Sequence, residues 1–133
     1  MRFAKWSFRL AAIYGILLLA PFYVLEKAIA SASVPIAHPE YFYGFVGTAL
    51  AAQLLFLLIS TDPQRYRPAM PIAVLGKVSF GIPAWILWLE GRIGGDVTAL
   101  GTVDLFLAAC FAISWLLTPG QGRDEPARSG TGR

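Results

Sequence analysis

Four long apolar stretches, separated by short polar gaps, constrain this chain more than any other feature of its sequence. They are residues 8–25, 41–60, 69–89 and 97–117. The hydrocarbon core of a bilayer is about 30 Å thick, and a helix of about 20 residues crosses it. Because lipid offers no hydrogen-bond partner to a backbone amide, each stretch is predicted to be a transmembrane α-helix.

The gaps between the stretches predict how the helices are connected. Residues 26–40, 61–68 and 90–96 are short, and short connections make neighbouring helices run in opposite directions. We therefore predict an all-α polytopic membrane protein, an antiparallel up-down bundle of four transmembrane helices within residues 1–117. Residues 118–133 are rich in Gly, Pro and charge, and are predicted to form a disordered cytoplasmic tail.

The composition agrees with a membrane location and argues against several classes of function. Hydrophobic residues make up 56% of the 133 residues and charged residues 14%, against about 25% charged residues in soluble domains. The single cysteine, Cys110, excludes an internal disulfide, and neither it nor the single histidine, His38, can form a metal site alone. We therefore predict no metal and no cofactor. The basic residues form no block, so nucleic-acid binding is not expected.

The basic residues also predict the orientation of the bundle. Most of them lie near the N-terminus, in the second gap and in the tail: Arg2, Lys5, Arg9, Arg65, Arg67, Arg123, Arg128 and Arg133. The other two gaps contain only Lys27 and Arg92. The positive-inside rule then places both termini in the cytoplasm of a bacterial inner membrane.

The first stretch has an alternative interpretation. Arg2, Lys5 and Arg9, followed by an apolar run and the small residues "AIASAS", resemble a secretory signal peptide with a cleavage site. The apolar run is long for such a peptide, and Glu26 and Lys27 precede the small residues. We therefore expect the first helix to be retained, and cleavage would leave three helices in the same orientation.

Lys77 and Asp104 are ionisable residues inside the apolar stretches, with Gln53 as a neutral companion. Charges in lipid are costly, so they usually face the bundle interior or a partner. At 1.5 Å per residue, Lys77 lies roughly 12 Å deep and Gln53 roughly 10 Å deep, at a common level. Asp104 shares a face with the small residues Gly101 and Ala108, so it is expected to lie between helices.

Two roles remain open for these residues. They form either a polar site for a ligand or proton, or a structural feature in which Lys77 snorkels toward the cytoplasm. Because side chains lean toward the N-terminus of their helix, Lys77 and Asp104 are expected to lean apart, which weakens a direct ion pair.

Three further residues are candidate site residues. Glu90 follows Pro83, and a kink at this proline would open a cavity near Glu90 at the outer side. The alternative, which we favour, is a proline that the membrane helix tolerates without such a cavity. Arg65 and Arg67, on either side of Tyr66, are candidates for binding anionic headgroups.

The segments "HPEYFYGFVG", "DPQRYRP" and "LGKVSFG", with "VDLFLA" in the last stretch, resemble small uncharacterised inner-membrane proteins of bacteria with four helices. These proteins are broadly similar to DoxX-like membrane proteins. The resemblance covers residues 8–117 and implies a membrane fold without an assigned catalytic residue. Some DoxX-like proteins are associated with redox or quinone-linked complexes.

We predict that the chain binds a partner protein, a second copy of itself, or an apolar ligand such as a lipid or quinone, within the bilayer. No catalysis is predicted. An alternative is a small oligomeric transporter that uses Asp104 and Lys77 as a coupled proton or substrate site. A membrane enzyme with Glu90, Asp104 or His38 as acid or base is a third alternative, although the sequence has no paired catalytic motif.

Overall fold

The structure, a computed structural model, describes residues 1–32 and 37–120, and its elements there are helices. In chain order they are α1 (Arg2–Leu19), α2 (Phe22–Ala32), α3 (Pro39–Thr61), the short 3₁₀ helix η1 (Arg67–Ala69), α4 (Met70–Leu89) and α5 (Gly95–Leu117). Four segments are long and apolar enough to cross a membrane: Arg2–Ala28, Pro39–Thr61, Arg67–Leu89 and Gly95–Leu117. The prediction of an all-helical chain with four such helices is confirmed.

The first apolar stretch differs from its predicted range of 8–25. Helix α1 begins before this range, and the stretch is interrupted at Pro21, after which α2 begins. Proline has no N–H to donate to the carbonyl of Leu17, and its ring crowds the preceding turn. The helical pattern resumes where the backbone N–H of Leu25 donates to the carbonyl of Pro21 at 3.0 Å.

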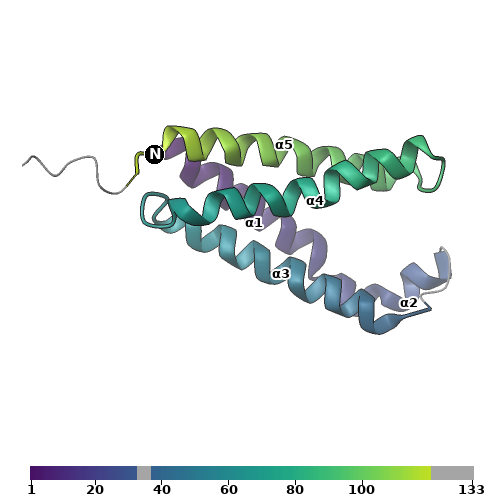
Figure 1. Ribbon diagram of the computed structural model, residues 1–133. Coiled ribbons are helices and arrows are strands. Elements are labelled where there is room, and N and C mark those ends of the chain that lie inside the picture. Colours follow the sequence, from purple (N-terminus) through teal and green to yellow (C-terminus); the bar gives the residue numbers. More distant parts are fainter. Residues whose placement is uncertain (33–36, 121–133) are drawn as a thin grey trace, which may run out of the picture.

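The helices pack as two pairs, α1 with α3 and α4 with α5. Helix α1 also contacts α5, which joins the pairs, whereas α3 and α4 contact each other only narrowly. Figure 1 shows the pairs close together at the end that holds the N-terminus and the α3–α4 turn. They diverge toward the end that holds α2 and the α4–α5 turn.

Three buried aromatic rings hold the helices together at the end that holds the N-terminus and the α3–α4 turn, which we call the closed end. The ring of Phe8 in α1 stacks on that of Phe111 in α5, with 4.0 Å between the ring centres. The ring of Phe56 in α3 meets that of Phe111 edge-on at 5.0 Å. All three side chains are buried, and each such pair adds about 0.5–1.5 kcal/mol beyond the burial of its area.

The described end of α5 packs on the α3–α4 connection. Thr118 is buried, its hydroxyl donates to the carbonyl of Ser114 at 2.7 Å, and its own carbonyl accepts from Arg67 Nε at 2.7 Å. Residue 118 therefore belongs to the packed fold and not to the predicted tail. The tail itself, from residue 121 onward, lies outside the described residues.

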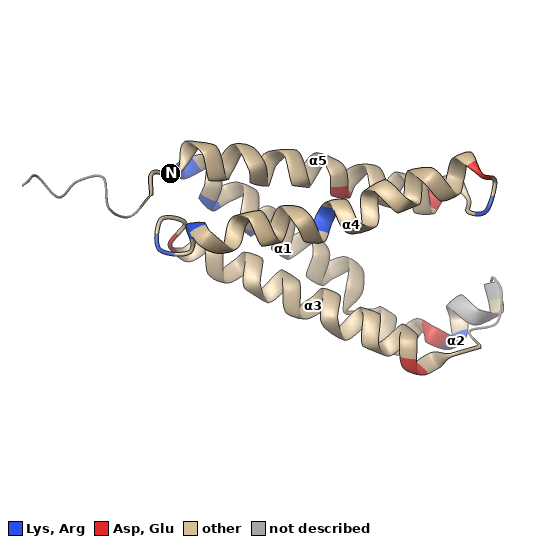
Figure 2. Ribbon diagram, viewed as in Figure 1, with Lys and Arg blue, Asp and Glu red and all other residues tan. Residues whose placement is uncertain are grey.

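The outward faces of the long helices are apolar. Leu17, Leu54, Leu75 and Phe106 are each more than half exposed, at 71%, 61%, 65% and 67%. Monomers in water rarely expose apolar patches of more than about a few hundred Å². Apart from the interior residues Lys77 and Asp104, charged residues gather near the two ends of the molecule, as Figure 2 shows. These features support a multi-pass membrane protein.

Candidate functional site

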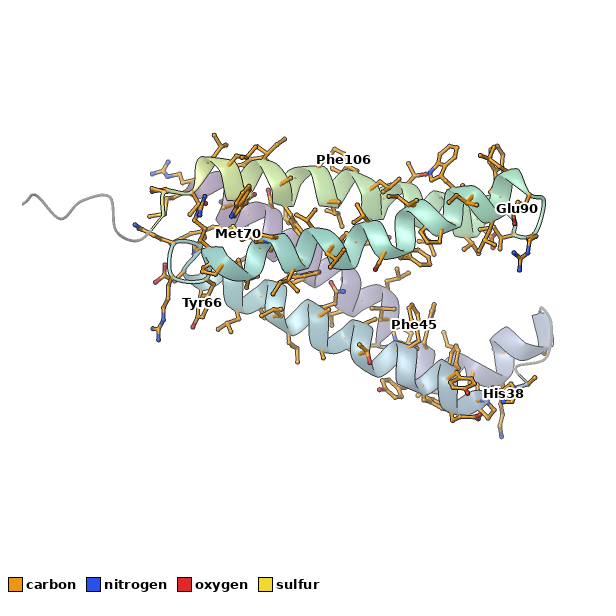
Figure 3. The ribbon with its side chains drawn as sticks, in the orientation of Figure 1. His38, Phe45, Tyr66, Met70, Glu90 and Phe106 are labelled. Atoms are coloured by element: carbon orange, nitrogen blue, oxygen red, sulfur yellow. The ribbon has the colours of Figure 1, made fainter. Side chains whose placement is uncertain are left out.

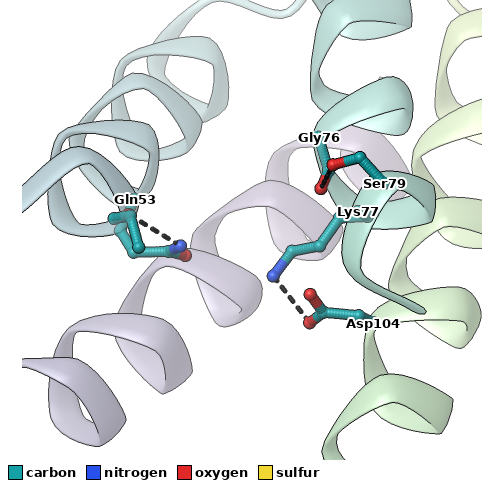
Figure 4. Close-up of polar contacts among 6 residues, drawn as sticks. Gln53, Gly76, Lys77, Ser79 and Asp104 are labelled. Atoms are coloured by element: carbon teal, nitrogen blue, oxygen red, sulfur yellow. Dashed lines mark hydrogen bonds and ion pairs between the residues drawn. The ribbon is translucent and has the colours of Figure 1, made fainter. Parts of the chain in front are cut away.

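Lys77 and Asp104 form a direct ion pair in the interior, between α4 and α5 (Figure 4). Lys77 Nζ lies 2.8 Å from Asp104 Oδ1, and the two side chains are 9% and 17% exposed. The expectation that their opposite lean weakens a direct ion pair was wrong. The lean of a side chain is set by its first bond, whereas the long flexible stem of lysine carries the ammonium group well beyond that point.

A close approach of α4 and α5 beside the ion pair explains why the two residues can meet. A Cβ added to Gly81 would lie 2.9 Å from the carbonyl oxygen of Gly101, so the two backbones nearly touch. Gly81 lies one turn from Lys77 in α4, and Gly101 lies one turn from Asp104 in α5. Small residues permit this separation between membrane helices, and the separation brings the carboxylate within reach of the ammonium group.

Gln53 of α3 lies near this pair and has an unused acceptor. Its side chain is buried, and Nε2 donates to the carbonyl of Ala49 at 3.1 Å. Rotating the amide by half a turn would bring Oε1 toward that carbonyl, so the bond to Ala49 fixes which atom is which. Within residues 1–32 and 37–120, Oε1 has no hydrogen-bond partner. Such buried acceptors are rare in proteins.

A cavity of about 250 Å³ lies where the two helix pairs diverge, and all three polar residues line it. Its wall is mostly aromatic and aliphatic, with contributions from Tyr14, Leu18, Phe22, Phe45, Phe80 and Leu100. Figure 3 shows Phe45 extending from α3 into the gap between the pairs. An apolar wall with a few convergent polar groups is typical of small-molecule sites.

The three polar residues that line the cavity carry one positive and one negative charge, so their net charge is zero. Lys77 Nζ also lies 5.7 Å from the centre of the Phe56 ring, within the range of a cation–π contact. In Figure 4 the amide end of Gln53 points toward this ammonium group. We call Gln53, Lys77 and Asp104 the polar floor.

Glu90 and His38 lie apart from the polar floor, although Glu90 was grouped with it from the sequence. Glu90 is exposed at the end of α4, where its Oε2 pairs with Arg92 at 3.2 Å. His38 is exposed and its Nδ1 lies 3.0 Å from Glu40. The cavity does not include Glu90, and helix α4 continues through Pro83.

The two headgroup candidates differ in their surroundings. Arg65 is exposed, with its guanidinium 5.6 Å from the ring of Tyr66. Arg67 is partly buried, lies 5.0 Å from the ring of Trp115 and donates to the carbonyl of Thr118. Arg67 therefore has a packing role at the closed end, whereas Arg65 remains accessible to a headgroup.

Sequence analysis missed the contribution of α1 to the site. Tyr14 lines the cavity, and Gly15 lies directly against the side chain of Gln53. Gly15 is the only glycine in an apolar run of α1, and this isolated position was the available signal. No metal-binding group of three His, Cys, Asp or Glu side chains occurs in the part of the chain that the structure describes.

No protein-family model, curated protein or solved structure matches this chain significantly. The resemblance to DoxX-like proteins therefore stays a prediction.

Proposed function

We propose that the chain is a multi-pass protein of the bacterial inner membrane, an antiparallel up-down bundle of four helices with both termini in the cytoplasm. The four apolar helices and the exposed apolar side chains support the membrane location. The excess of Lys and Arg near the closed end supports the orientation.

Cysteine labelling in intact cells tests this orientation. In a Cys110→Ala background, Arg65→Cys is expected to react with a membrane-impermeant maleimide only after lysis. Glu90→Cys, at the opposite end of α4, is expected to react before lysis, in cells whose outer membrane is permeable to the reagent and whose inner membrane is intact. The reverse pattern would contradict the orientation.

We further propose that the protein binds an apolar ligand of the lipid or quinone class in the cavity between its helix pairs. The observation that carries this proposal is the cavity itself, about 250 Å³ with an apolar wall and the polar floor. This volume approaches the lower end of small-molecule sites, about 300 Å³. Such a concave site suits part of a small apolar molecule better than it suits a partner protein, the other occupant expected from the sequence.

Mass spectrometry of the purified protein tests this proposal, because a bound lipid or quinone co-purifies in detergent. Gly76 lines the cavity, and a Cβ there would have no described atom within 4 Å. Gly76→Leu is therefore expected to fold and to reduce the amount of co-purified ligand. Gly44→Leu is the matched control, since Gly44 has equal space but lies outside the cavity lining. Equal ligand content in both variants would contradict the proposal.

Transport is the second candidate function, favoured by the ion pair that lines the cavity. Intramembrane charges are frequently part of proton or substrate pathways. In proteoliposomes, proton-coupled flux of a candidate substrate is expected to be abolished by Asp104→Asn. Unchanged flux in a folded Asp104→Asn protein would exclude a coupling role for this carboxylate.

A further inference from the structure

We infer that the cavity selects ligands whose polar end is neutral and carries a hydroxyl group, so that it prefers a membrane alcohol or quinol over a quinone or a phospholipid. This inference rests on the proposed ligand-binding function and adds the chemistry of the ligand's polar end. The polar floor and the apolar wall supply the evidence.

The charge of the polar floor argues for a neutral polar end. The ammonium group of Lys77 and the carboxylate of Asp104 neutralise each other at 2.8 Å and are largely shielded from solvent. A phosphate or an ammonium headgroup brought into this cavity would add a net charge with no counter-ion from the polar floor. Burying an unpaired charge is far more costly than burying a neutral polar group.

The hydrogen-bonding groups of the polar floor argue for a hydroxyl. The ion pair uses one of the three N–H donors of Lys77 and one of the two oxygens of Asp104. Oε1 of Gln53 is without a partner among the described residues but is buried against Gly15, so the acceptor that the polar floor offers to a ligand is the second oxygen of Asp104. Acceptors and donors are therefore both available close together. A hydroxyl donates one hydrogen bond and accepts others, whereas a quinone carbonyl only accepts.

The shape and lining of the cavity account for the rest of the ligand. The wall is formed by rings and branched side chains from all five α-helices, including Phe22, Phe45 and Leu100. Such a wall binds apolar chains or rings through burial and dispersion contacts. The hydroxyl would then contact the polar floor while the apolar body extends along the wall toward the diverging end of the helix pairs.

Two matched pairs of probes test the inference on the full-length protein in detergent, with binding measured by native mass spectrometry. The first pair is dodecanol and dodecyl methyl ether, which differ in the hydroxyl donor. The second is dioctanoylglycerol and dioctanoyl phosphatidic acid, which differ in charge. In the first pair the alcohol is expected to bind about tenfold more tightly than the ether, the value of one hydrogen bond to a charged group. In the second pair the diacylglycerol is expected to bind at least about tenfold more tightly than the phosphatidic acid, because burying an unpaired charge costs more than burying a neutral polar group.

A further comparison distinguishes the biological sources of the hydroxyl. A short-chain quinol and the corresponding quinone are measured beside the diacylglycerol. Tighter binding of the quinol than of both the quinone and the diacylglycerol identifies a quinol site. Tighter binding of the diacylglycerol than of the quinol, with the quinol still above the quinone, identifies a membrane alcohol. Tighter binding of the quinone than of the quinol overturns the inference.

Variants of the polar floor connect the preference to these residues. Lys77→Met combined with Asp104→Leu replaces the pair by apolar side chains of similar size, an exchange that proteins often tolerate. The alcohol-to-ether preference is expected to disappear in this variant. Asp104→Asn provides a second measurement if the double variant does not fold, and it is expected to lower the same preference, because an amide oxygen is a weaker acceptor than a carboxylate oxygen. An unchanged preference in whichever variant folds overturns the inference.

The same titrations separate this inference from the proposed function. If both members of each pair bind equally, or if the phosphatidic acid binds more tightly, the selectivity is wrong while ligand binding stands. If no probe binds, the proposed function and the inference both fail.

Discussion

Gly15 of α1 lies directly against the side chain of Gln53 in α3. A Cβ added to Gly15 would lie 2.2 Å from Gln53 Oε1 and 2.8 Å from its Cγ, so no larger residue fits without displacing the glutamine. Since Gln53 is part of the polar floor, this contact lets a residue of α1 control the position of a polar group in the cavity.

Gly15→Ala is expected to destabilise the protein by about 1–3 kcal/mol, because overpacking forces side chains and backbone to shift. The free energy of unfolding in detergent, followed by circular dichroism, measures this loss. Adding Gln53→Ala removes the atoms that the new methyl group meets, so the double variant should be more stable than the sum of the single changes predicts. Strict additivity would show that the two residues do not interact.

Gly81→Ala and Gly101→Ala are expected to separate α4 from α5. Their added Cβ atoms would meet Leu105 Cγ at 2.6 Å and Ala84 Cβ at 2.7 Å, respectively. We expect a loss of about 1–3 kcal/mol in unfolding free energy for each variant. Gly44→Ala is the control, because its Cβ would have no described atom within 4 Å. A loss of similar size in the control would indicate a general effect of replacing helix glycines.

Asp104→Leu is expected to cost about 3–5 kcal/mol of stability, since it leaves the ammonium group of Lys77 buried without its carboxylate. Lys77→Met should cost a similar amount for the same reason. The double variant is expected to recover most of this loss, because an apolar pair of similar volume needs no desolvated charge. A complete double-mutant cycle of unfolding free energies measures the coupling. A coupling near zero would mean that the ion pair contributes nothing to the packing of α4 on α5.

Arg67→Ala is expected to loosen the end of α5 from the α3–α4 connection. It removes the hydrogen bond to the Thr118 carbonyl and the contact with the Trp115 ring. A loss of about 1–3 kcal/mol is expected, since a partly buried acceptor is left without its donor. The matched control is Arg65→Ala, an exposed site where the change should stay within about 0.5 kcal/mol. Hydrogen exchange of the last turn of α5 locates the effect, and protection equal to that of the parent protein would contradict it.

The sequence by itself predicted that lipid surrounds the long helices of this protein, and it predicted how many long helices there are. Four runs of about 20 apolar residues have one low-energy backbone in lipid, the α-helix, whatever their neighbours are. The same reasoning identified Lys77, Asp104 and Gln53, because polar groups are conspicuous in such runs. It also placed Gly101 and Ala108 on the face that the structure buries.

The tertiary structure alone decided which of these groups meet. The lean of a side chain is a local property and suggested that Lys77 and Asp104 point apart, but the approach of α4 to α5 at Gly81 and Gly101 overrides it. The cavity arises because α1 and α3 diverge from α4 and α5, a relation among four helices that no single stretch encodes. Periodicity reports the environment of each helix, whereas a site depends on distances between helices, and those depend on the packing of all of them together.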